Sequence, residues 1–302
     1  MEHETAGDPI SGLKWTRKTT EKVAIELRGL GIKVCPNTVG RLLKDLDYSL
    51  RVNHKELSSG SGPERNEQFG YIRELRERFR RRGLPVISVD TKKKELVGNF
   101  KNNGAAWSKE PIAVNDHDFR SLGRGIAVPY GIYDVQANRG CVFVGMSGET
   151  PEPAVSSIEK WWRYDGQHRY KSADELLILA DCGGSNGYRP LAWKYNLQNF
   201  CDRHGISVTV AHYPPGASKW NPIEHRLFSE ISKNRAGKPL DTYETILNYI
   251  STTRTATGLK VKAYFDTRDY PKGVEISKQQ MSRIHLEKHE TLPRWNYTIT
   301  PS

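Results

Sequence analysis

The chain has 302 residues and a formal net charge of +11 at pH 7. This length suits one large domain with a small appendage, and the positive charge favours nucleic acid over a membrane surface as partner. No apolar run approaches the ~20 residues of a membrane span, and the start does not resemble a signal peptide, so a cytoplasmic protein is expected. The four cysteines form no C-x-x-C pair, which argues against a zinc knuckle or a disulfide framework.

The first predicted elements are two short helices between residues 16 and 46. Apolar residues recur at helix spacing in 23–30 and again in 39–46, on either side of a glycine. This pattern is typical of a helix-turn-helix-like DNA-binding region, predicted here over residues 1–57. Polar side chains able to reach bases and phosphates lie on the second helix, namely Asn37, Thr38, Arg41 and Lys44. An ordinary helical hairpin with a solvated polar face explains the pattern equally well.

A linker and a basic helix are predicted over residues 58–83. The stretch Ser58–Pro63 has the Ser- and Gly-rich composition of a flexible linker. Residues 64–82 then indicate a charged amphipathic helix that ends in Arg80, Arg81 and Arg82. These arginines can follow a DNA backbone, or they can simply be solvated surface charge.

From residue 84 the order of elements predicts an α/β domain that extends to residue 302. Strands are expected at 85–90, near 94–100, and at 127–133 or 141–146. A helix near 153–164, a strand at 176–181, a helix near 189–204, a strand at 206–211 and a helix from Pro222 follow. Three early strands followed by alternating helix and strand are the element order of a ribonuclease-H-like mixed sheet flanked by helices.

Three acidic residues are predicted to form a metal site in this domain. Asp90 and Asp181 end apolar, strand-like runs, where a buried carboxylate is costly unless it is hydrogen-bonded or holds a cation. Glu224 falls inside the apolar arc of its helix, so its side chain is expected to point toward the sheet. These oxygen ligands suit Mg²⁺ or Mn²⁺. The pattern therefore suggests phosphoryl transfer by a DDE nuclease or transposase.

Two alternatives concern these acidic positions. Asn221, Pro222 and Glu224 also match a helix-capping pattern, in which Glu224 would have a purely structural role. Asp134 ends another strand-like run and is the main competitor for the second or an auxiliary carboxylate. It ranks below Asp181, because the Gly-rich turn that follows Asp181 and the downstream helix fit a ligand site better.

Basic and aromatic residues near the predicted site are further candidates for DNA contact. Lys92 and Lys93 follow the first aspartate and can neutralise phosphates, although lysines also protect exposed edge strands. Lys219, Trp220 and Arg226 surround the glutamate. Trp220 can stack on an unpaired base, and a buried structural tryptophan is at least as good an explanation.

Several of these segments closely resemble the ISAzo-thirteen family of insertion-sequence transposases. The similar segments are SVDTKKKELVGNFKNNG (88–104), PYGIYD (129–134), LLILADCGGSNGYR (176–189), HYPPGASKWNPIEHRLFS (212–229) and WNYTI (295–299). The segment LGIKVCPNTVGRLLKDL (30–46) is similar to the family's DNA-binding helical region. The resemblance runs from about Gly7 to Ile299. It departs from the family at Cys182, where Gly is common, and at Arg235, where Trp is common.

The resemblance implies a DDE transposase that cleaves and transfers DNA strands with two metal ions. It carries the catalytic, metal-binding triad onto Asp90, Asp181 and Glu224, with Mg²⁺ or Mn²⁺ as cofactor. Transposon-end and target DNA are the implied partners, together with self-association on DNA and association with the nucleoid when bound. Family members carry further residues ahead of this chain, so a truncated copy is expected. A standalone nuclease and a non-catalytic DNA-binding regulator are therefore kept as alternatives.

Overall fold

The chain divides into two compact units, residues 1–57 and 58–302. The computed structural model describes residues 5–7, 14–16, 18–49, 63–146, 150–271 and 273–302. The predicted linker at 58–63 therefore lies outside the described residues, apart from Pro63. Across these described ranges, no helix is both long enough and apolar enough to span a membrane.

The first unit contains two helices and a short antiparallel pair of strands. Its elements are β1 (Thr5–Gly7), β2 (Lys14–Thr16), α1 (Thr20–Gly29) and α2 (Pro36–Asp45). The Thr19 hydroxyl caps α1 by accepting a hydrogen bond from the Lys22 backbone N–H at 3.3 Å. Val23, Ala24 and Val39 form a small buried core between the helices. Both helices match the sequence prediction, whereas the two strands were not predicted.

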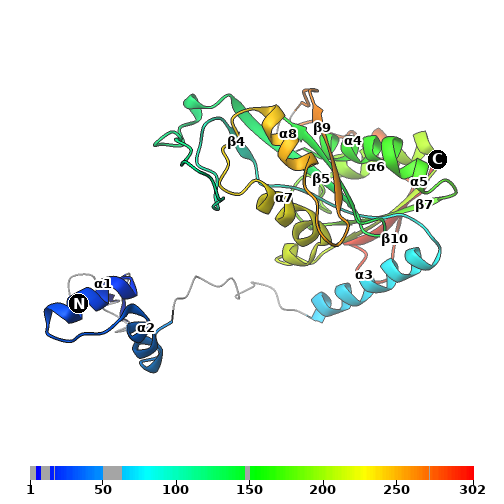
Figure 1. The fold of residues 1–302 in the computed structure, drawn as a ribbon. Coiled ribbons are helices and arrows are strands. Elements are labelled where there is room, and N and C mark those ends of the chain that lie inside the picture. The colour runs from blue at the N-terminus through cyan, green and yellow to red at the C-terminus, as the bar shows by residue number, and fades with distance from the viewer. Residues whose placement is uncertain (1–4, 8–13, 17, 50–62, 147–149, 272) are drawn as a thin grey trace. The chain divides into compact units, whose positions relative to one another are not determined.

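The second unit is built on a mixed sheet that has nine strands within the described residues (Figure 1). The strands are β3 (Val86–Thr91), β4 (Glu95–Val97), β5 (Gly125–Asp134), β6 (Arg139–Gly145), β7 (Glu175–Ala180), β8 (Ser207–His212), β9 (Lys260–Asp266), β10 (Leu286–Lys288) and β11 (Asn296–Ile299). Their order is β10-β11-β8-β7-β3-β5-β6-β9, and β4 pairs with β5 outside this path.

The five central strands have the connectivity of a ribonuclease-H-like fold, as predicted. Strands β3, β5 and β6 form an antiparallel meander. On the other side of β3, strands β7 and β8 continue the sheet in parallel. Strand β9 extends one edge parallel to β6, and β11 extends the other edge antiparallel to β8.

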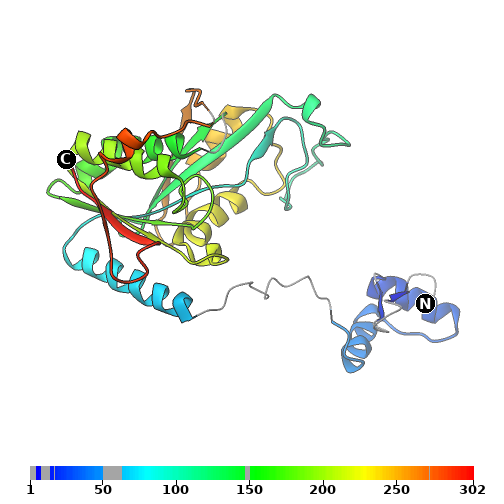
Figure 2. The ribbon, with the colours of Figure 1, turned by 180° about the vertical axis from the view of Figure 1, so that it is seen from behind.

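Helices cover both faces of this sheet (Figures 1 and 2). One face packs against α4 (Pro151–Trp161), the π turn η3 (Trp162–Gly166) that continues it, and α6 (Leu191–His204). The other face packs against α3 (Pro63–Arg81), the π turn η5 (Glu224–Phe228), α7 (Ser229–Asn234) and α8 (Tyr243–Ser251). Shorter helical pieces are α5 (Gln167–Arg169), α9 (Lys278–Met281), η2 (Arg120–Leu122) and η4 (Ser218–Trp220).

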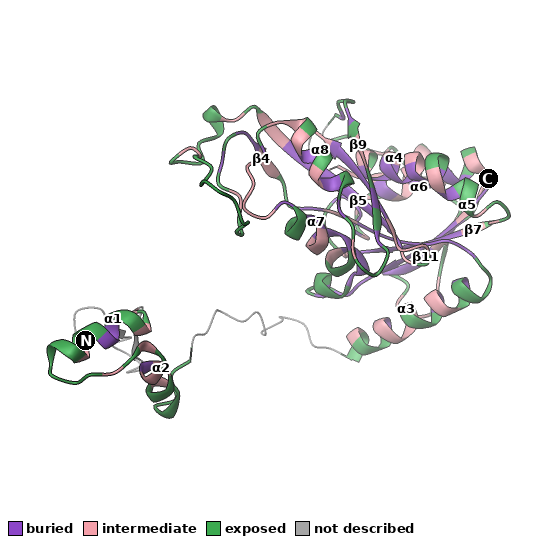
Figure 3. Cartoon of the chain, in the orientation of Figure 1, coloured by how far each residue is buried: buried purple, intermediate pink, exposed green. Residues whose placement is uncertain are grey.

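Strand β7 shows why an interior strand can be apolar along almost its whole length. Leu176 and Ile178 pack on the α4 and α6 side, while Leu177 and Leu179 pack on the α3 side. Side chains alternate between the two faces of a strand, so a strand covered on both faces buries every residue. Figure 3 shows this burial along the centre of the sheet.

Several boundaries differ from the sequence prediction. Both alternative early strands form, as β5 and β6, and the strand expected near 94–100 is shortened to β4. The helix expected near 153–164 changes to a π turn after Trp161. Asp90 is the last but one residue of β3, and Asp181 follows directly after the end of β7.

Candidate active site

Asp90 and Asp181 lie at the same level on neighbouring parallel strands. The pairing of β3 with β7 places Ser88 opposite Leu179, and the two aspartates follow two residues later on each chain segment. Because residues two apart on a strand share a face, Asp90 lies on the same face as Ser88. Both carboxylates are half-buried and line one cavity of about 750 Å³, beside the Gly-rich turn at 183–187.

Glu224 reaches this region because its helix packs very closely on β5. Asp90 pairs with Gly131 across β3 and β5. A Cβ atom at Gly131 would lie 2.4 Å from a ring carbon of Phe228 and 2.9 Å from Cδ1 of Ile223. Only glycine allows such a close approach. Gly131 therefore lets the helical segment that carries Glu224 sit directly on the strand pair that carries Asp90.

The helical segment at Pro222–Asn234 contains a π turn where it begins. Its first two residues are α-helical, the π turn spans Glu224–Phe228, and α7 continues from Ser229. The predicted apolar arc is buried as Ile223, Leu227, Phe228 and Ile231. Glu224 is half-buried at the edge of this arc, whereas the two residues that follow it are exposed. Single π turns inside helices are frequent at functional sites.

One side chain, Asn221, links the three elements of the site. Its amide nitrogen donates to Asp181 Oδ1 at 3.1 Å and to the Val89 carbonyl oxygen at 3.3 Å. Its amide oxygen accepts a hydrogen bond from the Ser88 hydroxyl, and that hydroxyl accepts one from the Ile223 backbone N–H at 2.9 Å. The side chain that caps the helix is therefore that of Ser88 on β3. A capping role would require the Asn221 side chain to point toward the helix, but it points toward Asp181.

We expect Asn221→Ala to lower the free energy of unfolding by about 2–4 kcal/mol, since it leaves several buried polar groups without partners. Asn234→Ala is the matched control, because Asn234 is exposed and hydrogen-bonds only at the surface. It should cost about 1 kcal/mol or less. Urea unfolding followed by tryptophan fluorescence measures both. Equal losses in the two variants would show that Asn221 does not hold the site together.

The backbone of Asp181 is fixed by a second buried network. His212 Nδ1 lies 2.9 Å from the Asp181 carbonyl oxygen, and burial lowers the pKa of His212 to about 4. The neutral ring therefore donates from Nδ1 and accepts through Nε2 from the Tyr297 hydroxyl at 3.3 Å. Trp193 donates to the same hydroxyl at 2.9 Å. The residue after β7 is thereby tied to β11, two strands away in the sheet.

The electrostatics of the site favour a cation. Burial raises the pKa of Asp181, although hydrogen bonds from Ser218 and Asn221 partly offset the effect. Burial also raises the pKa of Glu224, and the negative charge of Asp181 adds to it, whereas Lys92 opposes it. Two half-buried carboxylates that repel each other are a mark of functional sites.

No three His, Cys, Asp or Glu side chains among the described residues are close enough together to hold a metal ion. The Asp90 carboxylate accepts a hydrogen bond from the Thr91 backbone N–H at 2.7 Å. The donor set of Asp90, Asp181 and Glu224 nevertheless fits Mg²⁺ or Mn²⁺, because these ions prefer carboxylate oxygens. A divalent cation would also relieve the repulsion between Asp181 and Glu224.

Lys92 is buried, in contrast to the exposed edge lysine that its sequence context suggested. Its side chain is paired with Glu95 at 3.0 Å, and Arg235 forms an ion pair with the same carboxylate. Both cations are almost completely buried. Desolvation lowers the pKa of Lys92. Lys93, the next residue, is exposed.

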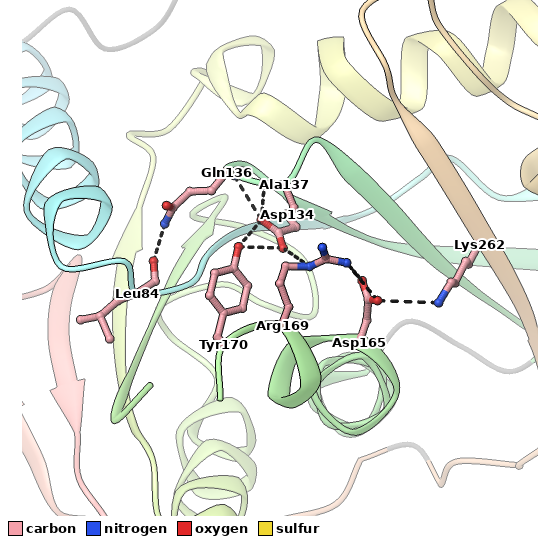
Figure 4. A network of polar contacts seen from close by, with 8 residues as sticks. All are labelled: Leu84, Asp134, Gln136, Ala137, Asp165, Arg169, Tyr170 and Lys262. Atoms are coloured by element: carbon pink, nitrogen blue, oxygen red, sulfur yellow. Dashed lines mark hydrogen bonds and ion pairs between the residues drawn. The ribbon is translucent and has the colours of Figure 1, made fainter. Parts of the chain in front are cut away.

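Asp134, the competing carboxylate, lies at the opposite end of the strands. It pairs with Ile87 at the start of β3, whereas Asp90 pairs with Gly131. It is completely buried, and its carboxylate holds the turn after β5 (Figure 4). Its partners are the Tyr170 hydroxyl at 2.9 Å and 3.0 Å, the backbone N–H groups of Gln136 and Ala137, and Arg169 at 3.7 Å. Asp134 is therefore outside the candidate site.

The aromatic and basic candidates that flank the glutamate are exposed. In η4 the Lys219 ammonium lies 4.3 Å from the centre of the Trp220 ring. The Trp220 side chain is 45% exposed, so the buried structural alternative does not hold. Arg226 is exposed on the outer side of the π turn.

The arginines at the end of α3 are exposed but ion-paired. Arg80 and Arg81 both lie 2.8 Å from Glu77. Arg82 pairs with Glu175 and lies 3.5 Å from an oxygen of Asp174. On α2 the predicted contacts Asn37, Arg41 and Lys44 are exposed, and Thr38 is half-buried.

Comparison with known proteins relates the whole chain to one family. The sequence matches the family described as Rhodopirellula transposase DDE domain over residues 1–301. Among solved structures, the chain is similar to a Mos1 transposase paired-end complex with the left transposon end, at 13% identity and a TM-score of 0.47. It is also similar to a pre-cleavage Mos1 transpososome, at 14% identity and a TM-score of 0.44. Both similarities cover 77% of this chain and 65% of the Mos1 chain. No curated protein matches the chain.

Proposed function

Because the chain belongs to the Rhodopirellula transposase DDE domain family, we propose that it cleaves DNA and transfers the cleaved strand to a new site. The observation that supports the proposal is that Asp90 and Asp181 line one cavity, while the negative charge of Asp181 is near enough to raise the pKa of Glu224. Asp90 and Asp181 end adjacent parallel strands, and the helix of Glu224 sits on Gly131 beside them.

In this proposal Asp90, Asp181 and Glu224 hold Mg²⁺ or Mn²⁺. Two such ions, when bound, supply charge stabilisation to the attacking and leaving oxygens of an in-line displacement. Asn221 keeps the Asp181 carboxylate oriented through its 3.1 Å hydrogen bond. The cationic Lys92 partly offsets the negative charge near Glu224. The buried networks thus hold the carboxylates in place before substrate arrives, which is how preorganised sites lower a barrier.

The reaction consists of two phosphoryl transfers. Water first attacks the scissile phosphodiester at the element end, and the departing 3′-oxygen takes up a proton to become a 3′-hydroxyl. That hydroxyl then attacks a phosphodiester of the target, which releases a target 3′-hydroxyl as the new strand bond forms. Each step exchanges one P–O bond for another, so no covalent protein intermediate is required.

We infer that residues 1–57 and the basic surfaces supply DNA affinity. The exposed residues Asn37, Arg41 and Lys44 lie on α2 and are not part of the buried core of that unit. Transposon ends and target DNA are the proposed partners, with self-association on DNA to bring two ends together.

The decisive experiment incubates the purified protein with its flanking element ends, a target plasmid and Mg²⁺. Nicked ends together with joined strands are expected. Nicks without joined products would instead identify a standalone nuclease, whereas binding without nicks would identify a DNA-binding regulator.

Metal removal provides a separate prediction. Exhaustive chelation should abolish cleavage, and Mg²⁺ or Mn²⁺ should restore it, because the proposed ligands are all oxygens. Ca²⁺ should support DNA binding with little chemistry. The same chelated sample, tested by gel shift, controls for loss of DNA binding. Full cleavage after chelation would rule out the metal site.

The arginines at the end of α3 yield a prediction for DNA affinity. Replacing Arg80, Arg81 and Arg82 by Ala should lower the affinity for all duplexes alike. It should also reduce the slope of log affinity against log salt concentration, by up to about one unit per lost phosphate contact. The surface ion pairs that these residues form are weak enough to be exchanged for phosphates. A gel-shift salt titration measures the slope. An unchanged slope would mean that the three arginines are only solvated surface charge.

A further inference from the structure

A second cavity lies at the end of the sheet that is remote from the carboxylates. Its volume is about 220 Å³, and it opens between the starts of β6 and β9 and the π turn after α4. Arg139 and Lys260, the first residues of β6 and β9, are paired in register. Arg139 also lies opposite Asp134, which pairs with Ile87 at the start of β3. Asp90 lies three residues further along β3, roughly 10 Å away along the strand.

Positive charge prevails in this cavity. It is lined by four cationic side chains, Arg139, Arg254, Lys260 and Lys262, and by one carboxylate, that of Asp165. This carboxylate already accepts hydrogen bonds from Arg169, at 3.0 Å and 3.1 Å, and Lys262 lies 3.7 Å from it. Figure 4 shows these contacts.

Three of the lining cations are not neutralised by the protein. Within the described parts of the chain, no ion pair engages Arg139, Arg254 or Lys260. Arg254 and Lys260 are also exposed and face each other in a short antiparallel bridge. A concave site with an excess of one charge attracts a ligand of the opposite charge, here an anion.

Aromatic rings form the remaining wall. Trp161 is buried at the base of the cavity, and the rings of Tyr164 and Tyr264 lie 5.4 Å apart at an angle of 49°. The Tyr164 side chain is 48% exposed. A half-exposed ring beside cationic groups is the arrangement with which proteins stack an unpaired base while they hold its phosphate.

We propose that this cavity binds one unpaired nucleotide of a DNA strand, away from the scissile phosphate. Its phosphate would lie between Arg254 and Lys260, and its base would stack on Tyr164. This inference rests on the proposed function in one respect, namely that the anionic partner of the protein is DNA.

The test compares two double variants of the full-length protein that lose the same charge. Arg254→Gln with Lys260→Gln alters the cavity, and Lys278→Gln with Arg283→Gln alters exposed residues outside it. The probe is a fluorescein-labelled strand of eight thymidylates, and the readout is fluorescence anisotropy across a salt series. The cavity variant should bind about tenfold more weakly, with the salt slope reduced by about 0.7 per lost contact. Tyr164→Ala should weaken binding about fivefold or more.

Three results would overturn the proposal. Equal losses in the two double variants would mean that general surface charge binds the strand. Competition by free thymidine monophosphate at concentrations similar to those of the strand would identify a free nucleotide as the ligand. If a poly-aspartate peptide displaced the labelled strand as effectively as the unlabelled strand does, the ligand would be an acidic peptide. Thermal unfolding of each variant confirms that it is folded.

Failure of the proposed function is distinguishable from failure of this inference. Wild-type DNA cleavage by Asp90→Asn would reject the carboxylate site and leave the anisotropy comparison unaffected, because Asp90 does not line the second cavity.

Discussion

Asp181→Asn is expected to abolish DNA strand cleavage while the protein stays folded, and Asp90→Asn and Glu224→Gln should do the same. Each change removes the charge of a proposed metal ligand, and loss of several kcal/mol of transition-state stabilisation would lower the rate about a thousandfold or more. In the absence of metal, the free energy of unfolding of the variants should be unchanged or higher than that of the wild type. The reason is that the charged side chains of Asp181 and Glu224 repel each other.

Glu230→Gln is the control for the carboxylate variants. It lies on the same helical segment but pairs with Lys233 at the surface, at 2.6 Å. Its cleavage rate and unfolding should match those of the wild type. Wild-type cleavage in any one of the three site variants would refute the assignment of that residue.

Gly131→Ala should have the second largest effect, although it changes no charged group. The new Cβ would lie 2.4 Å from the Phe228 ring and 2.9 Å from Ile223, so the helical segment must move away from β5. Overpacking of this kind costs about 1–3 kcal/mol. Because Glu224 is the first residue of the displaced π turn, cleavage should fall more than the loss of stability explains.

The control for this variant is Gly145→Ala on β6, where the nearest atom to a new Cβ is the Val128 carbonyl oxygen at 3.9 Å. Combining Gly131→Ala with Phe228→Leu should restore part of the lost stability by making room. Urea unfolding and single-turnover cleavage measure the two effects. If Gly131→Ala matched Gly145→Ala in both measurements, close seating of the helix on β5 would not be required.

The central fold could be predicted from the sequence because the order of its strands and helices follows from local patterns, and the placement of Asp90 and Asp181 at one end of the sheet followed from that fold. Asp90 and Asp181 each end a largely apolar run, which marks a strand buried on both faces. The helical period placed Glu224 inside the buried arc, whereas the structure finds it half-buried at the edge of that arc. Parallel strands bring their carboxyl ends to one edge, so the two aspartates had to meet once β3 and β7 were neighbours.

Asp134 shows what a local pattern cannot reveal. It ends an apolar run just as Asp90 does, but β5 runs antiparallel to β3, so its carboxyl end lies at the opposite edge of the sheet. Strand direction is a property of pairing between distant segments. The same reason hid the role of Asn221, whose partners Ser88 and Val89 are 133 and 132 residues away in the sequence.

The outer strands were also beyond prediction. Lys260–Asp266 is an edge strand in which exposed lysines are mixed with buried and half-buried residues, and β11 has only four residues. The π turn at Glu224 depends on packing against β5 and leaves no composition signal of its own.

The position of β11 has a consequence for how the protein matures on the ribosome. Tyr297 on this strand supports His212, which fixes Asp181, and β11 covers the edge of β8. Domains generally fold as units in the order in which they are synthesised. Residues 1–57 can therefore fold early, whereas the carboxylate site is complete only after residues 296–299 have left the exit tunnel. A nascent chain would form its first compact unit well before the proposed site is complete.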